Sequence, residues 1–242
     1  MIGRLEKVSV IMPVYNGEQF LRTSIESILA QTQRNFELLV VDDASTDSTP
    51  KLLDYYSDND ERLQLLTCSH QGAGAARNLA LAHATGDTVF FLDVDDYLPQ
   101  NFLEDALMKL DTVSADMLMV PYCYFDSSPE DAGNPVMDYV ADEGLYEGSA
   151  CAPLLYDIAY FACTRIYRRT FMAAHNIAFG EGYIYEDNPP FVNAVLNAQR
   201  IVVSHKPVYS VRRNVNSLSR SSYDYCFAPS SLIWLYSRTA SG

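Results

Sequence analysis

The sequence predicts an α/β fold in which a mostly parallel central sheet is covered by helices on both faces. Within about a hundred residues, short apolar runs that suit strands alternate four times with segments of helical spacing. The apolar runs are nearly continuous, which is typical of strands buried in a parallel sheet. Two of these runs end in acidic residues, at positions 42–43 and 93–96. Ligands of open α/β sheets collect at the carboxyl ends of strands, so this edge is where we expect a site.

The first two strands and their helices follow from apolar spacing and turn residues. A strand is expected over residues 8–12, ending at Pro13, and residues 14–17 form a turn. Helical spacing after this turn predicts a helix whose apolar face holds Leu21, Ile25, Ile28 and Leu29. A second strand is expected over residues 36–41. Thr49, as an N-cap before Pro50, predicts a helix that continues to residue 56.

The next two strands enclose a helix of small residues. A strand is expected over residues 63–67, followed by a loop with Gly72 and Gly74 and by a helix over residues 75–84 that Gly86 ends. The run over residues 88–92 is too short for a helix and too apolar for an exposed edge. It therefore predicts a buried fourth strand.

The pattern becomes less regular past Pro99. A helix is expected over residues 102–110 and a strand over residues 116–120, and the polar loop at 126–134 marks a seam. We expect two halves of one domain, residues 1–125 and 126–242. The apolar run at residues 232–236 suggests a helix at the end of the sequence, and we expect the natural protein to be longer.

Composition excludes several classes of function. The formal net charge of −14 argues against a sequence-independent grip on nucleic acid. Five scattered cysteines without Cys-x-x-Cys spacing suggest neither a zinc site nor a disulfide framework. The N-terminal residues predict no signal peptide, and no run reaches about 18 apolar residues. These features predict a cytoplasmic protein, and a longer C-terminal segment is where a peripheral contact with the inner face of the membrane would be expected.

The acidic end of the fourth strand suggests a metal site. If the chain stays extended through Val94, its period of two places Asp93 and Asp95 on the same side. Two close carboxylates repel each other, and a hard divalent ion, Mg²⁺ or Mn²⁺, is the simplest compensation. The alternative is that Asp93, Asp95 and Asp96 are solvated loop residues, one of which caps the next segment.

Five motifs in one order resemble family 2 glycosyltransferases. They lie at residues 8–16 (VSVIMPVYN), 41–49 (VDDASTDST), 72–78 (GAGAARN), 92–96 (LDVDD) and 186–188 (EDN). The chain looks like a bacterial member of this family. The resemblance implies a GT-A fold and the transfer of a sugar, with inversion, from a nucleotide diphosphate donor that is commonly a UDP-sugar. Residues 1–125 would then bind the donor, and residues 126–242 would bind a saccharide or lipid-linked acceptor and supply the base.

The resemblance assigns the donor site to the strand ends. Pro13 and Tyr15 would lie beside the nucleobase, and Asp42 or Asp43 would accept its imino proton. The alternative is that Tyr15 packs on the following helix and that Asp43 or Ser45 closes a turn. These are the residues at the first two strand ends.

The remaining donor contacts implied by the resemblance involve a metal and the diphosphate. Asp93 would touch the ribose or the metal, and Asp95 would bind the metal directly. The fork of Arg77 suits a diphosphate, or instead pairs with strand-end acids. The glycines before it lack the third glycine of a dinucleotide-binding fingerprint.

In the second half, the resemblance makes Asp187 the general base, with Glu186 as its nearest substitute. Such a base contributes about 10² to 10⁴ in rate. On spacing alone, both acids would be caps or dipole partners of a helix that enters through Pro189. Arg212 and Arg213 resemble the segment near the diphosphate, although Asn214 stands where many relatives have histidine. The alternative is a solvated basic strand end, and the four histidines receive no role.

Two other functions fit parts of the pattern. Residues 90–98 also look like the nucleophile motif of haloacid-dehalogenase-type phosphatases, although that motif begins near the N-terminus in its family. A non-catalytic sugar-nucleotide-binding domain would keep the fold without transfer.

Overall fold

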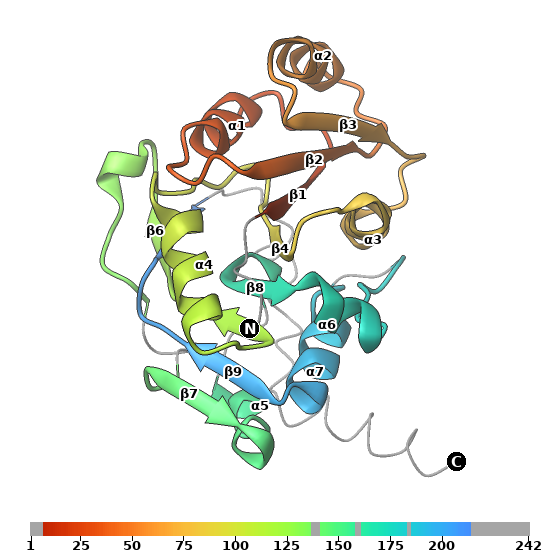
Figure 1. Ribbon diagram of the computed structural model, residues 1–242. Helices are drawn as coiled ribbons and strands as arrows, with labels where there is room; N and C mark the ends of the chain where they lie inside the picture. The colour runs from red at the N-terminus through yellow and green to blue at the C-terminus, as the bar shows by residue number, and fades with distance from the viewer. Residues whose placement is uncertain (1–6, 137–140, 158–160, 183–184, 214–242) are drawn as a thin grey trace, which may run out of the picture.

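The computed structural model describes residues 7–136, 141–157, 161–182 and 185–213, and it has the predicted α/β architecture (Figure 1). One sheet has the strand order β3-β2-β1-β4-β8-β5-β9-β7, and β10 pairs with β6 in a second, parallel sheet. In the large sheet, β3, β2, β1 and β4 run parallel, as do β5 and β9, whereas β8 is antiparallel to both of its neighbours and β7 to β9. The prediction of a mostly parallel sheet is therefore confirmed.

The strands in chain order are β1 (Val8–Val14), β2 (Phe36–Asp42), β3 (Leu63–Thr67), β4 (Thr88–Phe91), β5 (Met117–Met119), β6 (Tyr122–Phe125), β7 (Gly144–Glu147), β8 (Arg165–Arg168), β9 (Arg200–Val203) and β10 (Tyr209–Arg212). The α-helices are α1 (Leu21–Leu29), α2 (Thr49–Asn59), α3 (Ala73–His83), α4 (Phe102–Thr112), α5 (Leu154–Asp157), α6 (Arg169–Ala174) and α7 (Asn188–Asn197). Short 3₁₀ turns lie at Pro129–Asp131, Gly148–Ala150 and Ala162–Thr164.

Two hydrophobic layers hold the helices against the sheet. One layer contains buried residues of α1, α2 and α4, such as Ile25 and Phe102. The other contains buried residues of α3, α5, α6 and α7, such as Ala80 and Phe191. Figure 1 shows α1 and α4 on one side of the strands and α3, α6 and α7 on the other. Strands β1, β2 and β4 are thus buried on both faces, as their continuous apolar sequences predict, whereas the edge strands β3 and β7 are partly exposed.

Two of the predicted boundaries are wrong at the ends that face the site. Strand β1 continues through Pro13 to Val14, because proline removes one donor but leaves neighbouring carbonyls free to pair. The Val14 oxygen accepts from Asp43 N at 2.8 Å. Thr49 is also not the N-cap of α2: Ser48 holds that position, and the buried Thr49 Oγ1 accepts from Gly17 N at 2.8 Å.

Helix α3 begins at Ala73, so Gly74 lies inside it. A Cβ atom at Gly74 would collide with the carbonyl oxygen of Gly180 and would contact the Glu186 side chain. The missing side chain at Gly74 therefore makes room for the protein's own backbone at Gly180. Helix α3 therefore packs closely against Gly180 and against the side chain of Glu186.

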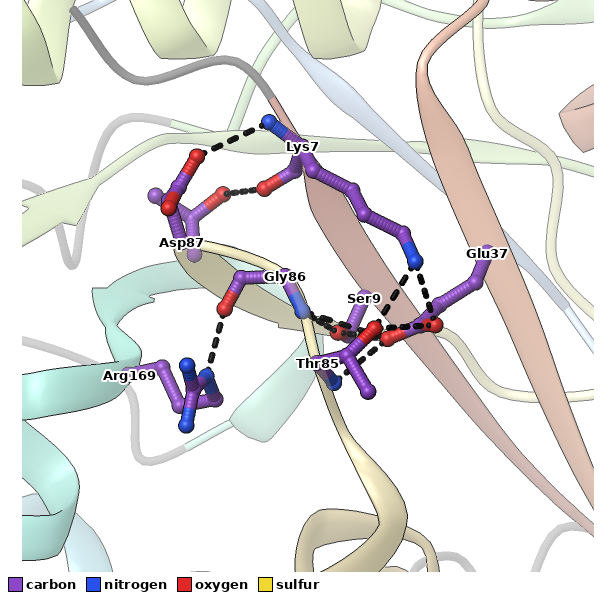
Figure 2. A network of polar contacts seen from close by, with 8 residues as sticks. Lys7, Ser9, Glu37, Thr85, Gly86, Asp87 and Arg169 are labelled. Carbon is purple, nitrogen blue, oxygen red and sulfur yellow. Dashed lines mark hydrogen bonds and ion pairs between the residues drawn. The ribbon is translucent and has the colours of Figure 1, made fainter.

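At the amino ends of the same strands, a buried polar network joins β1, β2 and the segment before β4 (Figure 2). Glu37 accepts hydrogen bonds from Lys7 Nζ at 2.8 Å, Ser9 Oγ at 2.5 Å and Thr85 N at 2.7 Å. Burial alone raises the pKa of Glu37, but the hydrogen bonds from Lys7, Ser9 and Thr85 outweigh it and lower the pKa to about 2. Because this network lies at the opposite sheet edge from the acidic strand ends, we assign it to stability.

Candidate functional site

The carboxyl ends of β1, β2 and β4 meet at one edge of the sheet, because these strands are parallel and adjacent. Tyr15 follows β1, Asp42 ends β2, and the acidic residues follow β4. Left-handed backbone conformations at Asn16 and Ala44 turn the chain away from the sheet directly after β1 and β2. The edge is therefore lined by short loops that carry the motif residues.

The acidic residues after β4 form a turn, which we call the acid turn and define as residues 93–96. The strand ends at Phe91, and Asp96 N donates to Asp93 O at 3.1 Å. The expectation that the chain stays extended through Val94 is wrong, so the alternation that placed Asp93 beside Asp95 does not apply. Instead, ligand atoms of Asp93, Asp96 and Cys163 lie within 4.8 Å of one another.

Arg77 forms ion pairs with three of the predicted site carboxylates. Its Nη2 lies 2.8 Å from Asp93 Oδ1, and its Nη1 lies 2.7 Å from Glu186 Oε1 and 3.1 Å from Asp187 Oδ1. The side chain is 5% exposed. Burial lowers the pKa of Arg77, but the three carboxylates outweigh it and hold the pKa above its ordinary value. Arg77 is thus a permanent buried cation, and the prediction that it pairs with strand-end acids is confirmed.

Asp187 is held at the start of α7 without capping it. It occupies the N-cap position, but its side chain makes no capping hydrogen bond. Its Oδ1 faces Arg77, and its Oδ2 accepts from Ala162 N at 3.0 Å. Burial raises the pKa of Asp187 to about 6, against the opposing charge of Arg77. A carboxylate with this pKa is ionised at neutral pH and is a stronger base than an ordinary aspartate.

At the ends of β1 and β2, Tyr15 is accessible to a ligand, whereas Asp42 is almost fully buried. Tyr15 is 46% exposed and packs against His70, with ring centroids 4.2 Å apart. Asp42 is buried, and its Oδ1 accepts from Ser45 N at 3.1 Å, which closes the turn. Asp43 accepts from three donors of the loop before α3, which are Gln71 N, Gly72 N and Cys68 Sγ. Asp43 is therefore committed to this loop, and Asp42 is the acid with more acceptor capacity left.

Arg212, the last residue of β10, and Arg213, which follows it, lie near the acid turn and its neighbours. Arg212 Nε donates to Asp95 O at 2.8 Å, and its guanidinium lies 4.4 Å from the Phe125 ring centroid. Arg213 Nη1 lies 3.5 Å from Asp126 Oδ2. Asn214 and residues 232–236 lie outside the described residues. The structure therefore brings Arg212 to the predicted acids, whereas Arg213 lies at the neighbouring loop.

Four residues of the site were missed by sequence reasoning. Asp96 was predicted only as a loop residue, Cys163 as a plain thiol, and His70 and Tyr209 received no role. A sequence signal existed for Asp96, which continues the acidic run. No local pattern could have placed Cys163 or Tyr209, because their partners lie far away in the sequence.

The residues of the acid turn fit a hard divalent cation. Burial, then the charges of Asp93 and Asp95, raise the pKa of Asp96 well above its ordinary range. The charges of Asp93 and Asp95 therefore add to the effect of burial at Asp96, and a divalent cation would offset them. Burial also raises the pKa of the Cys163 thiol, so it is a neutral and soft neighbour. Oxygen ligands from Asp93 and Asp95 would suit Mg²⁺ or Mn²⁺ better than zinc.

Comparison with known proteins identifies the family. A model described as "Glycosyl transferase family 2" matches residues 9–170, which is more than half of the chain. The chain belongs to glycosyl transferase family 2. The match covers the loops after β1, β2 and β4 and the Arg77 helix, so three of the five sequence motifs fall within it, as does all of the first motif except Val8.

Bacterial glycosyltransferases are similar over most of this chain. The poly(ribitol-phosphate) β-N-acetylglucosaminyltransferase TarS of Staphylococcus aureus is 30% identical over 225 residues, which cover 90% of this chain and 37% of TarS. The glycosyltransferase GlyA of Streptococcus pneumoniae is 29% identical over 220 residues, covering 89% of this chain and 32% of GlyA. The chain thus spans about a third of the length of each of these relatives.

Solved structures agree with the fold. A crystal structure of residues 1–349 of S. aureus TarS in complex with UDP-GlcNAc matches with a TM-score of 0.76 and 29% identity, covering 90% of this chain and 61% of that one. A mannosyltransferase of Pyrobaculum calidifontis shares the fold at 19% identity, with a TM-score of 0.68. Among the described residues, none of the helices is both long and apolar enough to cross a membrane.

Proposed function

We propose that this family 2 chain is an inverting, metal-dependent glycosyltransferase that uses a UDP-sugar and a hydroxyl of a saccharide or lipid-linked acceptor. The observation that carries the proposal is the Arg77 cluster. One buried guanidinium contacts Asp93, from the candidate metal site, and Asp187, the candidate base. In a displacement, the leaving diphosphate and the attacking hydroxyl lie on opposite faces of the same carbon atom. The metal that holds the diphosphate and the base that serves the hydroxyl must therefore be near each other, and Arg77 joins the candidates for both.

Residues at the ends of five strands, β1, β2, β3, β4 and β10, would hold the donor. Tyr15 and His70 offer an aromatic surface for the nucleobase, and Asp42 would accept its imino proton. TarS, whose structure contains UDP-GlcNAc, supports uridine as the nucleoside. Arg212, beside the acid turn, and Arg213 would contact the diphosphate, where the planar guanidinium suits paired phosphate oxygens. Asp93 and Asp95 would hold Mg²⁺ or Mn²⁺, which when bound would stabilise negative charge on the departing nucleoside diphosphate.

Asp187 would take the proton from the acceptor hydroxyl. Ala162 N and Arg77 fix both of its oxygens, so the carboxylate is oriented before the acceptor arrives. Phe161, partly exposed next to Ala162, offers an apolar surface on the same side. Attack from the face opposite the diphosphate would invert the anomeric centre. Glu186, also bound to Arg77, would help to set the position of that guanidinium.

The two other hypotheses have less support. The phosphatase hypothesis rests on residues 90–98 alone, whereas the family match extends far beyond them. A binding domain without turnover would retain the donor contacts but would not need a buried carboxylate with a raised pKa, as Asp187 has.

A thermal-shift screen tests the proposal. UDP, GDP, CDP and UDP-GlcNAc are each added with and without Mn²⁺, and UDP with Mn²⁺ is expected to raise the melting temperature most. A ligand at a hundredfold excess over its Kd stabilises by about 2.7 kcal/mol, which such a screen detects. Absence of stabilisation by any nucleoside diphosphate would reject the donor site. Release of UDP from UDP-GlcNAc, and no hydrolysis of p-nitrophenyl phosphate, would separate the enzyme from the other two hypotheses.

A further inference from the structure

Tyr209 is a buried residue whose polar atom contacts the acid turn. Its ring is fully buried and packs edge-on against Phe90 and Phe102, with centroid distances of 6.0 and 6.3 Å. Its hydroxyl donates to Asp96 Oδ2 at 2.8 Å and accepts from Asp93 N at 3.3 Å. The apolar ring is thus fixed in the core, while its one polar atom joins the first and last residues of the acid turn.

Asp96 also contacts Arg212, at the end of β10. Its second oxygen, Oδ1, accepts from Arg212 N at 2.9 Å, and Arg212 Nε donates to Asp95 O at 2.8 Å. Next to these bonds, Tyr97 and Ser210 exchange two backbone hydrogen bonds of 3.0 and 3.3 Å. The acid turn and β10 are more than a hundred residues apart in the chain, yet they form one hydrogen-bonded unit.

We propose that Tyr209 is a positioning residue for the metal and diphosphate site, acting through Asp96. Its hydroxyl holds the main chain of Asp93 and the carboxylate of Asp96, and Asp96 in turn holds the backbone of Arg212. One phenol therefore sets the position of a candidate metal ligand and of a candidate diphosphate contact. This inference rests on the proposed function and assigns roles in it to Asp96, which ends the motif at residues 92–96, and to Tyr209, which lies outside the five motifs.

The geometry separates this role from direct metal binding by Asp96. Asp96, Asp93 and Cys163 lie close enough to surround an ion. However, both Asp96 oxygens already accept strong hydrogen bonds, and the third group is a buried neutral thiol, which suits a hard cation poorly. Residues that orient metal ligands change metal affinity by about 10-fold to 100-fold when they are altered. Tyr209 and Asp96 fit that class.

Calorimetric titration of the full chain with UDP, in Mn²⁺ and in EDTA, measures how much the metal strengthens UDP binding. For Tyr209→Phe we expect this enhancement to fall by about 10-fold or more, while UDP binding in EDTA changes far less. Tyr56→Phe is the control, because the partly buried hydroxyl of Tyr56 on α2 also donates to a carboxylate, Glu26 Oε1 on α1, at 2.9 Å. The control should keep the wild-type enhancement.

A second variant covers the case in which Tyr209→Phe does not fold. Asp96→Asn keeps the volume and one acceptor, so the proposal expects a partial loss of the enhancement, no larger than that of Tyr209→Phe. The double variant should lose no more than the more affected single variant, because both act through one contact. If Asp96 binds the metal itself, Asp96→Asn instead abolishes the enhancement as completely as Asp93→Asn.

Three results overturn the inference. These are a wild-type enhancement in folded Tyr209→Phe, complete loss in Asp96→Asn, and independent losses that add in the double variant. If the wild-type chain shows no Mn²⁺-dependent UDP binding, the proposed function fails first and this inference falls with it. If the wild type binds and Tyr209→Phe binds equally well, only the inference fails.

Discussion

Replacement of Glu37 by glutamine is expected to destabilise the protein by about 3 kcal/mol near neutral pH. The network in Figure 2 lowers the pKa of Glu37 from 4.5 to about 2. At 1.36 kcal/mol for each pKa unit, this lowering corresponds to roughly 3 kcal/mol. Glutamine keeps the shape but loses the charge that Lys7 contacts. Its amide also replaces one carboxylate oxygen by an NH2 donor, which would face either Lys7 Nζ or the N–H groups of Thr85 and Gly86.

The pH dependence gives the same prediction a second test. Because the folded-state pKa is depressed, the stabilisation is complete above the unfolded pKa of about 4.5 and is lost as the pH falls toward about 2. The difference between wild type and Glu37→Gln should therefore shrink by about 2 kcal/mol between pH 7 and pH 3.

Urea unfolding at several pH values measures both quantities, provided that the slope of the unfolding free energy against urea is equal in the two proteins. Glu61→Gln, at an exposed carboxylate, is the control and should change the unfolding free energy by less than about 0.5 kcal/mol. A loss below about 1 kcal/mol at neutral pH, or a difference that stays constant with pH, would refute the reasoning about this network.

Four further predictions follow from the site. Asp187→Asn should retain UDP binding but release UDP from UDP-GlcNAc about 10² to 10⁴ times more slowly, and near-normal turnover would place the base elsewhere. In the wild type, turnover should fall as the pH drops below about 6, because the base must be ionised; a flat profile from pH 5 to 8 would contradict this. Asp95→Asn should remove Mn²⁺-dependent UDP binding while the fold stays intact, and unchanged calorimetry would exclude Asp95 as a ligand. Gly74→Ala should lower the unfolding free energy by more than about 2 kcal/mol through its collision with Gly180, whereas Gly144→Ala, which points into open space, should not.

Sequence reasoning succeeded where the physical cause is local. Apolar runs and turn residues located β1 to β4 and α1 to α4, because burial on both faces leaves a continuous signature in each strand. The acidic ends of β2 and β4 could be placed at one edge because parallel strands share a direction. Errors remained at the boundaries, where Pro13 and Thr49 found tertiary partners that override their usual local roles.

The site was only partly predictable because its contacts are remote in sequence. The acid turn closes through Asp96 N and Asp93 O, and side-chain alternation carries no information about such a turn. The sequence showed that Arg77 could donate hydrogen bonds to anionic groups. Its ion pairs with Asp93, Glu186 and Asp187, however, depend on packing between α3 and the start of α7. Tyr209 resembles any other buried aromatic residue until the fold places its hydroxyl beside Asp96.

The position of β8 has a consequence for how the chain is made. This strand, formed by residues 165–168, lies between β4 and β5 in the sheet, although both neighbours are synthesised earlier. Until it emerges from the ribosome, β4 and β5 have unpaired backbone groups along the edges that will later face β8. Open strand edges favour association with other chains. We therefore expect a nascent chain that stops short of residue 165 to require chaperone protection, even though most of its strands and the whole acid turn have already been synthesised.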